Sequence, residues 1–181
     1  MIDGIEIRRA SAADAPAVLQ MADGIIEWFV SMGNVSQWGT EPWSSSQKRI
    51  ARVTEALGLP DAWVAEHPDL GIVGVLVVGD AMEYVPAATE PEVYVRLLLA
   101  SRDERARGIG RRLMAFADER ARAAGVERLR VDCYGGGTGD LVKFYESCGY
   151  DRIQTFDIDG WPGQLLGRTL QDTVTAVRSG R

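Results

Sequence analysis

Residues 105–110, Arg-Ala-Arg-Gly-Ile-Gly, place two glycines between an apolar stretch and an amphipathic one. The apolar residues 93–100 predict a strand, and residues 109–124 predict a helix. The first N–H groups of a helix have no partner within the helix, and the helix dipole favours negative charge there. Gly108 and Gly110 permit positive φ and a close approach of the backbone to a ligand. A strand, a glycine turn and a helix in this order indicate a site for a phosphate chain.

Five arginines crowd this turn, although the formal net charge of the chain is −6. They are Arg102, Arg105, Arg107, Arg111 and Arg112. A pyrophosphate is the best reason for such a local reversal of charge. The acidic balance of the whole chain argues against nucleic acid as its main partner.

The periodicity of apolar residues predicts the elements that position this turn. Strands are expected at residues 5–8, 62–65, 72–78, 93–100, 127–134, 153–158 and 164–170, with residues 159–163 as a hairpin-like turn. Helices are expected from Ser11 to near Gly33, from Ser44 or Ser45 to Gly58, over residues 109–124 and over residues 140–147. Ser11 and Asp14 resemble a capping box for the first of them. This order predicts helices packed on a mixed sheet in one domain, residues 1–181, with its core at about 5–171 and a loosely held tail at 172–181.

Two cysteines and one histidine restrict the chemistry. Cys133 and Cys148 form no C-x-x-C pair, so we expect two reduced thiols in a cytoplasmic protein without a metal site. His67 precedes Pro68 and is typical of a turn, which leaves no obvious Ser-His-Asp or Cys-His arrangement. The first residues lack the apolar core of a signal peptide, and no stretch approaches the ~18 apolar residues that span a membrane.

Two motifs resemble those of the GCN5-related N-acetyltransferase (GNAT) family. Residues 105–110 match its Arg/Gln-x-x-Gly-x-Gly/Ala signature, and residues 144–150, Phe-Tyr-Glu-Ser-Cys-Gly-Tyr, are similar to its Tyr-Glu-x-x-Gly-Phe run. The element order fits the family over about residues 5–171. The resemblance implies an α/β (α+β) fold in which about four helices flank a mixed, largely antiparallel sheet of about seven strands.

The family resemblance also implies that acetyl-CoA binds and that its acetyl group moves to an amine. By position, the backbone of Leu98, Leu99 and Ala100 would hold the pantetheine arm. The pyrophosphate would be held by Arg105, Ala106, Arg107, Gly108, Ile109, Gly110 and Arg111. Tyr145 aligns with the general acid of the family, and Thr138 stands where many members have an asparagine that contacts CoA.

Acetyl transfer needs a neutral amine, whereas an alkyl ammonium group has a pKa near ~10. A base must therefore act, either a carboxylate or a water held by backbone carbonyls. The candidate carboxylates are Glu41, Glu83, Glu92 and Asp132, although the sequence favours a solvated surface group at each of these positions. Some family members place Glu or His on the strand before the glycine turn, where this chain has Tyr94 and Arg96. A backbone N–H near Leu99 could stabilise the oxyanion, and a tyrosine could protonate the leaving thiolate.

The tryptophan-rich loop at residues 37–43 is the expected acceptor site. Trp38, Glu41 and Trp43 would line it, although both indoles could instead cap the core. Trp161 could close the same pocket. Arg96 would contact the substrate or form a salt bridge on the sheet. The expected acceptor is a small molecule with a primary amine.

A second class of function is a regulatory module that binds acyl-CoA without catalysis, because no base is obvious. A dinucleotide-binding oxidoreductase is disfavoured, since Gly108 and Gly110 are not followed by a third glycine at the required spacing. We expect no membrane partner. The final strand and tail could pair two subunits into a homodimer.

Overall fold

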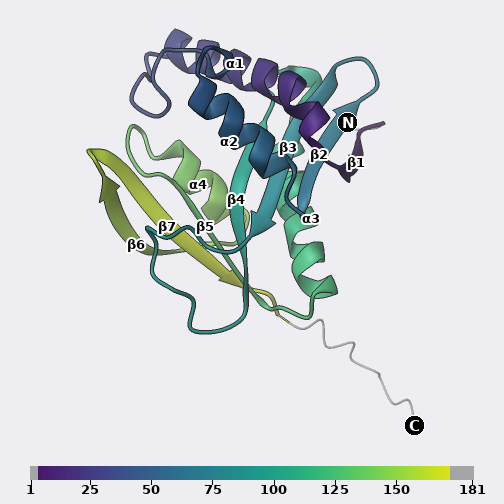
Figure 1. Cartoon of the computed structure of the whole chain (residues 1–181). Helices are drawn as coiled ribbons and strands as arrows, with labels where there is room; N and C mark the ends of the chain where they lie inside the picture. Colours follow the sequence, from purple (N-terminus) through teal and green to yellow (C-terminus); the bar gives the residue numbers. More distant parts are fainter. Residues whose placement is uncertain (1–3, 172–181) are drawn as a thin grey trace.

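A seven-stranded sheet in the order β1-β2-β3-β4-β5-β7-β6 forms the centre of the protein (Figure 1). The computed structural model describes residues 4–171. The strands are β1 (Glu6–Arg9), β2 (Ala62–His67), β3 (Gly71–Gly79), β4 (Glu92–Ala100), β5 (Arg128–Tyr134), β6 (Asp151–Ile158) and β7 (Trp161–Thr169). The α-helices are α1 (Ala15–Ser31), α2 (Gln47–Leu57), α3 (Ile109–Ala123) and α4 (Asp140–Ser147). The predicted mixed, largely antiparallel sheet with four helices is confirmed.

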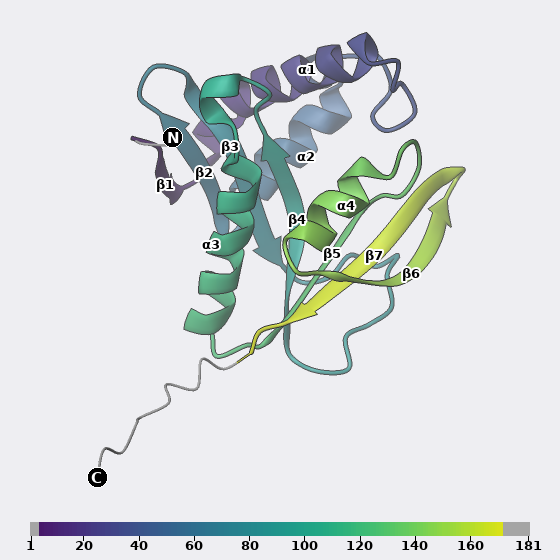
Figure 2. The ribbon, with the colours of Figure 1, turned by 180° about the vertical axis from the view of Figure 1, so that it is seen from behind.

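The helices cover the sheet in pairs. α1 and α2 lie on the face that is in front in Figure 1, and α3 and α4 lie on the opposite face, which Figure 2 brings forward. The buried residues of α3 recur at helical spacing, as the sequence predicts. They are Ile109, Gly110, Leu113, Met114, Ala117, Asp118 and Ala121. The two faces of the sheet therefore have separate hydrophobic cores.

β4 and β5 are the only parallel neighbours among the strands that the structure describes. Their pairing begins at Glu92 and Arg128 and ends at Val95 and Val131. Beyond Val95, β4 continues to Ala100 in register with β3 alone. The sheet is thus open between the ends of its two central strands.

A β-bulge lies at the point where this opening begins. Val78 pairs with Val95 and Val77 with Leu97, so Arg96 is the extra residue of β4. Val95 packs in the α3/α4 core, whereas Leu97 packs against the α1/α2 core. The bulge therefore changes which side chains of β4 face each helical layer.

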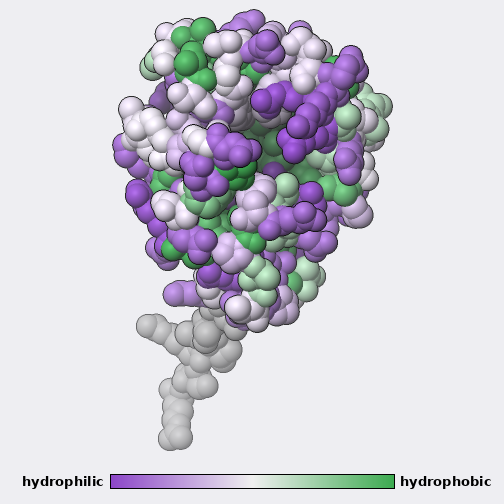
Figure 3. Space-filling view, turned by 60° about the vertical axis from the view of Figure 1, so that its left-hand side comes forward, coloured by the Kyte–Doolittle hydropathy of each residue, from purple (hydrophilic) through white to green (hydrophobic). Residues whose placement is uncertain are grey.

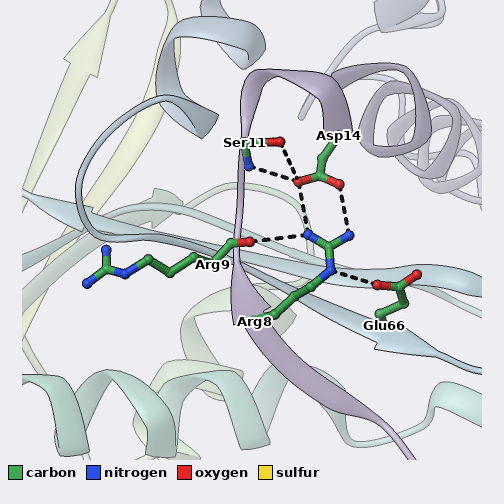
Figure 4. A network of polar contacts seen from close by, with 5 residues as sticks. All are labelled: Arg8, Arg9, Ser11, Asp14 and Glu66. Carbon is green, nitrogen blue, oxygen red and sulfur yellow. Dashed lines mark hydrogen bonds and ion pairs between the residues drawn. The ribbon is translucent and has the colours of Figure 1, made fainter.

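The edge strand β1 is tied to the body of the protein by Arg8 (Figure 4). Its guanidinium donates to the Asp14 carboxylate at 2.9 Å and to Glu66 of β2 at 2.7 Å. Asp14 also accepts from the backbone N–H of Ser11 at 2.8 Å, as expected of the predicted capping box. The hydrogen bond with Arg8 is the main reason that the pKa of Asp14 is lowered.

Three local predictions were wrong. Ser46 caps α2, not Ser44 or Ser45, because residues 43–45 form a short 3₁₀ turn before the helix. The β6–β7 turn contains only Asp159 and Gly160, both at positive φ, so residues 161–163 already belong to β7. The final strand cannot pair two subunits edge to edge, because β7 lies between β5 and β6.

The predicted tail at residues 172–181 lies outside the described residues. Within the described part, none of the helices has both the length and the apolar character needed to cross a membrane.

Candidate active site

The candidate site is centred on the opening between β4 and β5. Leu98, Leu99 and Ala100 lie on the part of β4 that has no strand beside it toward β5. Backbone groups on that side are free of sheet partners, so an extended ligand with amide groups could hydrogen-bond to them. Figure 3 brings forward the side with the β6–β7 tip and shows a hollow with hydrophobic side chains in its floor and hydrophilic ones around it.

The predicted phosphate turn adjoins the end of β4. Gly108 is the N-cap of α3 and adopts φ +91°, a left-handed conformation that favours glycine. Asp103 shapes the turn before it, because its carboxylate accepts from the backbone N–H of Arg105 at 2.9 Å and from that guanidinium. These hydrogen bonds lower the pKa of the Asp103 carboxyl to about 2. The start of α3 therefore presents its N–H groups at a pre-shaped turn.

Gly110 has a different role from Gly108. It lies inside α3 without a positive φ, and a Cβ there would lie 3.3 Å from Cζ of Phe144 and 3.5 Å from Cβ of Ala100. The missing side chain allows α4 and β4 to approach α3. The expectation that Gly110 serves a left-handed backbone is wrong; in the structure its small size serves packing within the protein.

The arginines around the turn are less uniform than the sequence suggests. Arg105 is paired with Asp103 at 2.9 Å. Arg111 donates to the Ser147 carbonyl oxygen and hydroxyl, each at 2.8 Å, and so joins α3 to α4. Arg112 donates to the Ile5 carbonyl oxygen at 2.9 Å. Arg102 lies over the Trp28 ring at 4.0 Å, and Arg107 is exposed on the turn itself.

Tyr145 lies on α4 against the α3/α4 face of the opening. Its side chain is buried, and its ring centroid is 5.1 Å from that of Phe144 and 6.1 Å from that of Tyr150. Burial raises the pKa of its hydroxyl well above the ordinary value, and Cys133 adds to the effect. The hydroxyl therefore keeps its proton at neutral pH and is available as a donor.

Cys133 is the sulfur group beside this tyrosine. It is buried on β5, and burial raises the pKa of its thiol to about 12. A thiol with such a pKa holds almost no thiolate at neutral pH, so it is a poor nucleophile. This agrees with a direct transfer that needs no covalent intermediate on the protein.

Asp132 lies on β5 next to Cys133, at the first position after the β4–β5 pairing ends. Its carboxylate accepts a short hydrogen bond from the Tyr94 hydroxyl and another from the Tyr84 hydroxyl at 3.2 Å. Burial raises the pKa of Asp132, and the two tyrosine hydrogen bonds oppose that rise. Asp132 pairs with Leu165, which packs with Tyr94 and Val85 in a cluster separate from the α3/α4 core. Asp132 and Tyr145 thus lie on opposite faces of β5.

The other carboxylates proposed as a base are placed differently. Glu92 forms a buried ion pair with Arg130, with N–O distances of 2.5 and 2.7 Å. Both oxygens of its carboxylate are therefore already bound to a cation. Glu41 and Glu83 are exposed. The interpretation of Asp132 as a solvated surface group is wrong, because burial raises its pKa and residues 4–171 give it no ion-pair partner.

The tryptophans of the α1–α2 loop pack largely on the protein. Trp43 is buried in the α1/α2 core, and its ring centroid lies 4.6 Å from that of Trp38, which is partly buried. Trp38 also meets the edge of Phe29 at 5.4 Å. Their packing favours the core-capping alternative for Trp43 and leaves Trp38 as the partly accessible indole of the pair.

Trp161 joins the last hairpin to the α1–α2 loop. Its Nε1 donates to the Gln37 carbonyl oxygen at 3.1 Å, and its ring centroid lies 5.7 Å from that of Tyr134 and 6.4 Å from that of Phe156. Phe156 in turn lies 5.6 Å from Tyr84. Trp161, Phe156 and Tyr84 therefore form an aromatic row from the hairpin to Asp132, which Tyr84 contacts through its hydroxyl.

Two further predicted site residues, Arg96 and Thr138, lie on β4 and in the loop before α4. Arg96 is exposed on the bulge of β4. The Thr138 hydroxyl donates to Asp140 at 2.5 Å in the loop that begins α4. Gln37 belongs to the predicted acceptor loop, whereas the sequence gives no role to Tyr84 or Phe156. These two reach the site from segments distant in the sequence, and the local signal is the clustering of aromatic residues near turns.

A surface cavity of about 510 Å³ lies elsewhere. It is bounded by α1, the start of β3 and Ser101, Arg102 and Asp103. These elements lie on the β3 side of β4, whereas the opening lies on its β5 side. The cavity adjoins the phosphate turn but contains none of the residues around Asp132 or Tyr145.

Comparison with solved structures supports this reading of the fold. A GNAT acetyltransferase from Listeria monocytogenes is 15% identical, with a TM-score of 0.67 and coverage of 92% of this chain and 95% of the other. An agmatine N-acetyltransferase is 16% identical, with a TM-score of 0.65 and coverage of 93% and 100%. The yncA protein from Salmonella typhimurium, solved with its cofactor acetyl-CoA, is 16% identical, with a TM-score of 0.61 and coverage of 95% and 97%.

At these identities the structures share the fold, and no curated protein matches the sequence. The sequence model of the acetyltransferase (GNAT) family matches residues 24–150, which is more than half of the chain. That segment contains the glycine turn, the opening between β4 and β5, and Tyr145. The chain therefore belongs to the GNAT family of acetyltransferases and is an acyltransferase.

Proposed function

We propose that this protein transfers the acetyl group of acetyl-CoA directly to the primary amine of a small molecule, with Asp132 as general base and Tyr145 as general acid. One observation carries the proposal. The two residues lie on opposite faces of β5, beside the opening where β4 and β5 part. A thioester in that opening has a proton acceptor on one face and a proton donor on the other.

Acetyl-CoA would supply the activated acyl group. The residues suited to hold it are the unpaired edge of β4 at Leu98, Leu99 and Ala100 and the turn before α3. Arg107 is exposed on that turn and free to contact phosphate, whereas Arg105 and Arg111 have protein partners that a phosphate would have to share or displace. The acetyl-CoA found with yncA supports the same class of ligand here.

Asp132 is suited to take a proton from the incoming ammonium group. A general base works best when its pKa lies near the pH at which the enzyme works, and burial raises the pKa of Asp132 in that direction. Tyr84 and Tyr94 fix its two oxygens, and each oxygen keeps a lone pair for a further hydrogen bond. As the pH falls through the raised pKa, the base is lost and activity falls.

Tyr145 is suited to protonate the departing thiolate. Its hydroxyl accepts and donates no hydrogen bond within residues 4–171. The burial that raises the pKa of the phenol also raises that of a thiol held beside it, so the small difference between the two groups persists. Cys133 beside it shows how strongly this environment disfavours a thiolate.

Release of free thiol from acetyl-CoA, measured against a panel of primary amines, tests this function. Tyr145→Phe should lower kcat by roughly 10–1,000-fold and leave CoA affinity nearly unchanged, because only the proton is removed. An unchanged kcat removes Tyr145 from the mechanism. Tight CoA binding without turnover of any amine would instead support the regulatory module.

The small size of the acceptor is supported by the setting of Asp132. Aromatic side chains and the loop at residues 80–91 surround it, and Arg130 fixes that loop by donating to the Pro86 carbonyl oxygen at 2.8 Å. A cytoplasmic location and a homodimer remain proposals; the free edges of the described sheet are β1 and β6.

A further inference from the structure

We propose that the acceptor carries a carboxylate as well as its amine, as an amino acid does, and that Arg96 and Arg52 hold that carboxylate while Asp132 receives the amine. This inference rests on the proposed function and names the substrate class for the same site.

Arg96 is placed by the bulge of β4. It is exposed at the residue where β4 and β5 part, and its Cδ lies 3.3 Å from the position of a Cβ on Gly79. The absence of a side chain on Gly79 gives the arginine stem room to lie along β3. Within residues 4–171 its guanidinium makes no ion pair, so the salt bridge considered for it from the sequence is not formed there.

Arg52 lies on α2, which covers the same face of the sheet as Leu97 of β4. It is exposed and, like Arg96, has no ion-pair partner among the described residues. The positive charges of both arginines act on the Tyr84 hydroxyl and oppose the rise of its pKa, which burial causes. That hydroxyl lies 3.2 Å from the Asp132 carboxylate. Two guanidinium groups from different elements, neither with an ion-pair partner in residues 4–171, therefore act electrostatically on the tyrosine that holds the proposed base.

The balance of charge distinguishes between classes of acceptor. Arg49, one turn before Arg52 on α2, adds a third cation and lies 4.9 Å over the Trp43 ring. A simple alkyl ammonium would be attracted by Asp132 but repelled by these three cations. An acceptor with both charges satisfies Asp132 through its amine and the arginines through its carboxylate, since guanidinium binds carboxylate through two parallel N–H donors. The aromatic row formed by Tyr84, Phe156 and Trp161 suits an apolar side chain on such a molecule.

Matched acceptors test the inference. Initial rates of acetyl transfer are measured for apolar amino acids, for the corresponding amino acid amides and for the amines that lack the carboxyl group. The same acids and amides are titrated by calorimetry into protein saturated with CoA. We expect the acids to have the lowest KM. Arg96→Gln should raise that KM by about 10- to 100-fold and change the KM of the amides by less than about threefold. Arg52→Gln should act in the same direction with a smaller effect, because it lies on the surface of α2.

Arg122→Gln is the matched control, since Arg122 is exposed in the last turn of α3 on the other face of the sheet. Amides or simple amines that match or exceed the acids overturn the inference and leave the acetyltransferase function standing. Acids that bind but are never acetylated support the inference and overturn the function. If no amino acid either binds or is acetylated, the inference is overturned as well. If Arg122→Gln raises the KM of the acids as much as Arg96→Gln does, Arg96 has no special role.

Discussion

The two faces of the opening between β4 and β5 are built in different ways. On the α3/α4 face, the glycine turn and Tyr145 belong to short motifs in which neighbouring residues act together. On the opposite face, Asp132 is held by Tyr94, 38 residues away, and by Tyr84, 48 residues away. The first face is local in sequence and the second is assembled by folding. In a family with a common acyl donor and many acceptors, we expect the first face to define the donor and the second to define the acceptor.

This contrast also separates the electrostatics of the two faces. Tyr145 lies among apolar and sulfur-containing side chains, where burial alone dominates its pKa. Asp132 lies among hydroxyl groups that oppose the effect of burial. The donor face therefore favours a neutral group that keeps its proton, whereas the acceptor face allows a carboxylate to change its protonation state.

The largest effect is expected from removal of the charge on the acceptor face. Asp132→Asn should lower kcat by roughly 10²–10⁴-fold, the usual contribution of a general base, and should abolish the acidic limb of the pH–rate profile. CoA affinity should not change. Asp151→Asn, at an exposed position of β6, is the control. If Asp132→Asn keeps the wild-type kcat and the acidic limb of the pH–rate profile, Asp132 is not the base, and a water molecule takes that role.

The donor face should be most sensitive at Gly108. Gly108→Val should weaken CoA binding by roughly 10- to 100-fold, because a β-branched residue at φ +91° costs about 1–3 kcal/mol and adds bulk at the phosphate turn. Calorimetry measures the change. Gly125→Val imposes a similar strain at φ +68° in an open position beyond the end of α3. If both variants lose CoA affinity equally, the loss reflects stability and not the phosphate turn.

A smaller effect is expected from the support of Asp132. Tyr84→Phe removes one hydrogen bond that lowers the pKa of Asp132, so that pKa should rise. The base then becomes protonated at a higher pH, and the acidic limb of kcat/KM should move upward. The loss in kcat at neutral pH should stay below about tenfold, since a hydrogen bond contributes about 0.5–1.5 kcal/mol. A limb that moves downward would contradict the placement of the base.

The smallest effect is expected in the α1–α2 loop. Trp38→Ala should raise the KM of the acceptor by about two- to fivefold and leave the KM of acetyl-CoA unchanged, because only part of the indole is accessible and such partial contacts are worth about 1 kcal/mol. Trp28→Ala is the control, on α1 and 37% exposed. If neither KM changes while the melting temperature falls, Trp38 only packs against Trp43.

The sequence predicts the local structure of the α3/α4 face well, because its information lies in neighbouring residues. The strand, the left-handed Gly108 and the start of α3 at Ile109 follow from residues next to one another. The acceptor face depends on the parallel register of β4 and β5, which brings Tyr94 beside Arg130 and Asp132 within reach. The periodicity of apolar residues does not reveal how two strands are aligned. The sequence therefore could not select Asp132 over the three other candidate carboxylates. Gly110 shows the same limit. A glycine is needed there because a side chain would press against Phe144, which belongs to a different helix.

The bond between Trp161 and Gln37 has a kinetic consequence. It links segments 124 residues apart, at one end of the aromatic row that leads through Phe156 to Tyr84. If an acceptor reaches Asp132 along this row, we expect a bulky one to pass only when that hydrogen bond is broken. Turnover of bulky acceptors would then be timed by the release of one indole N–H, and compact acceptors would escape that delay.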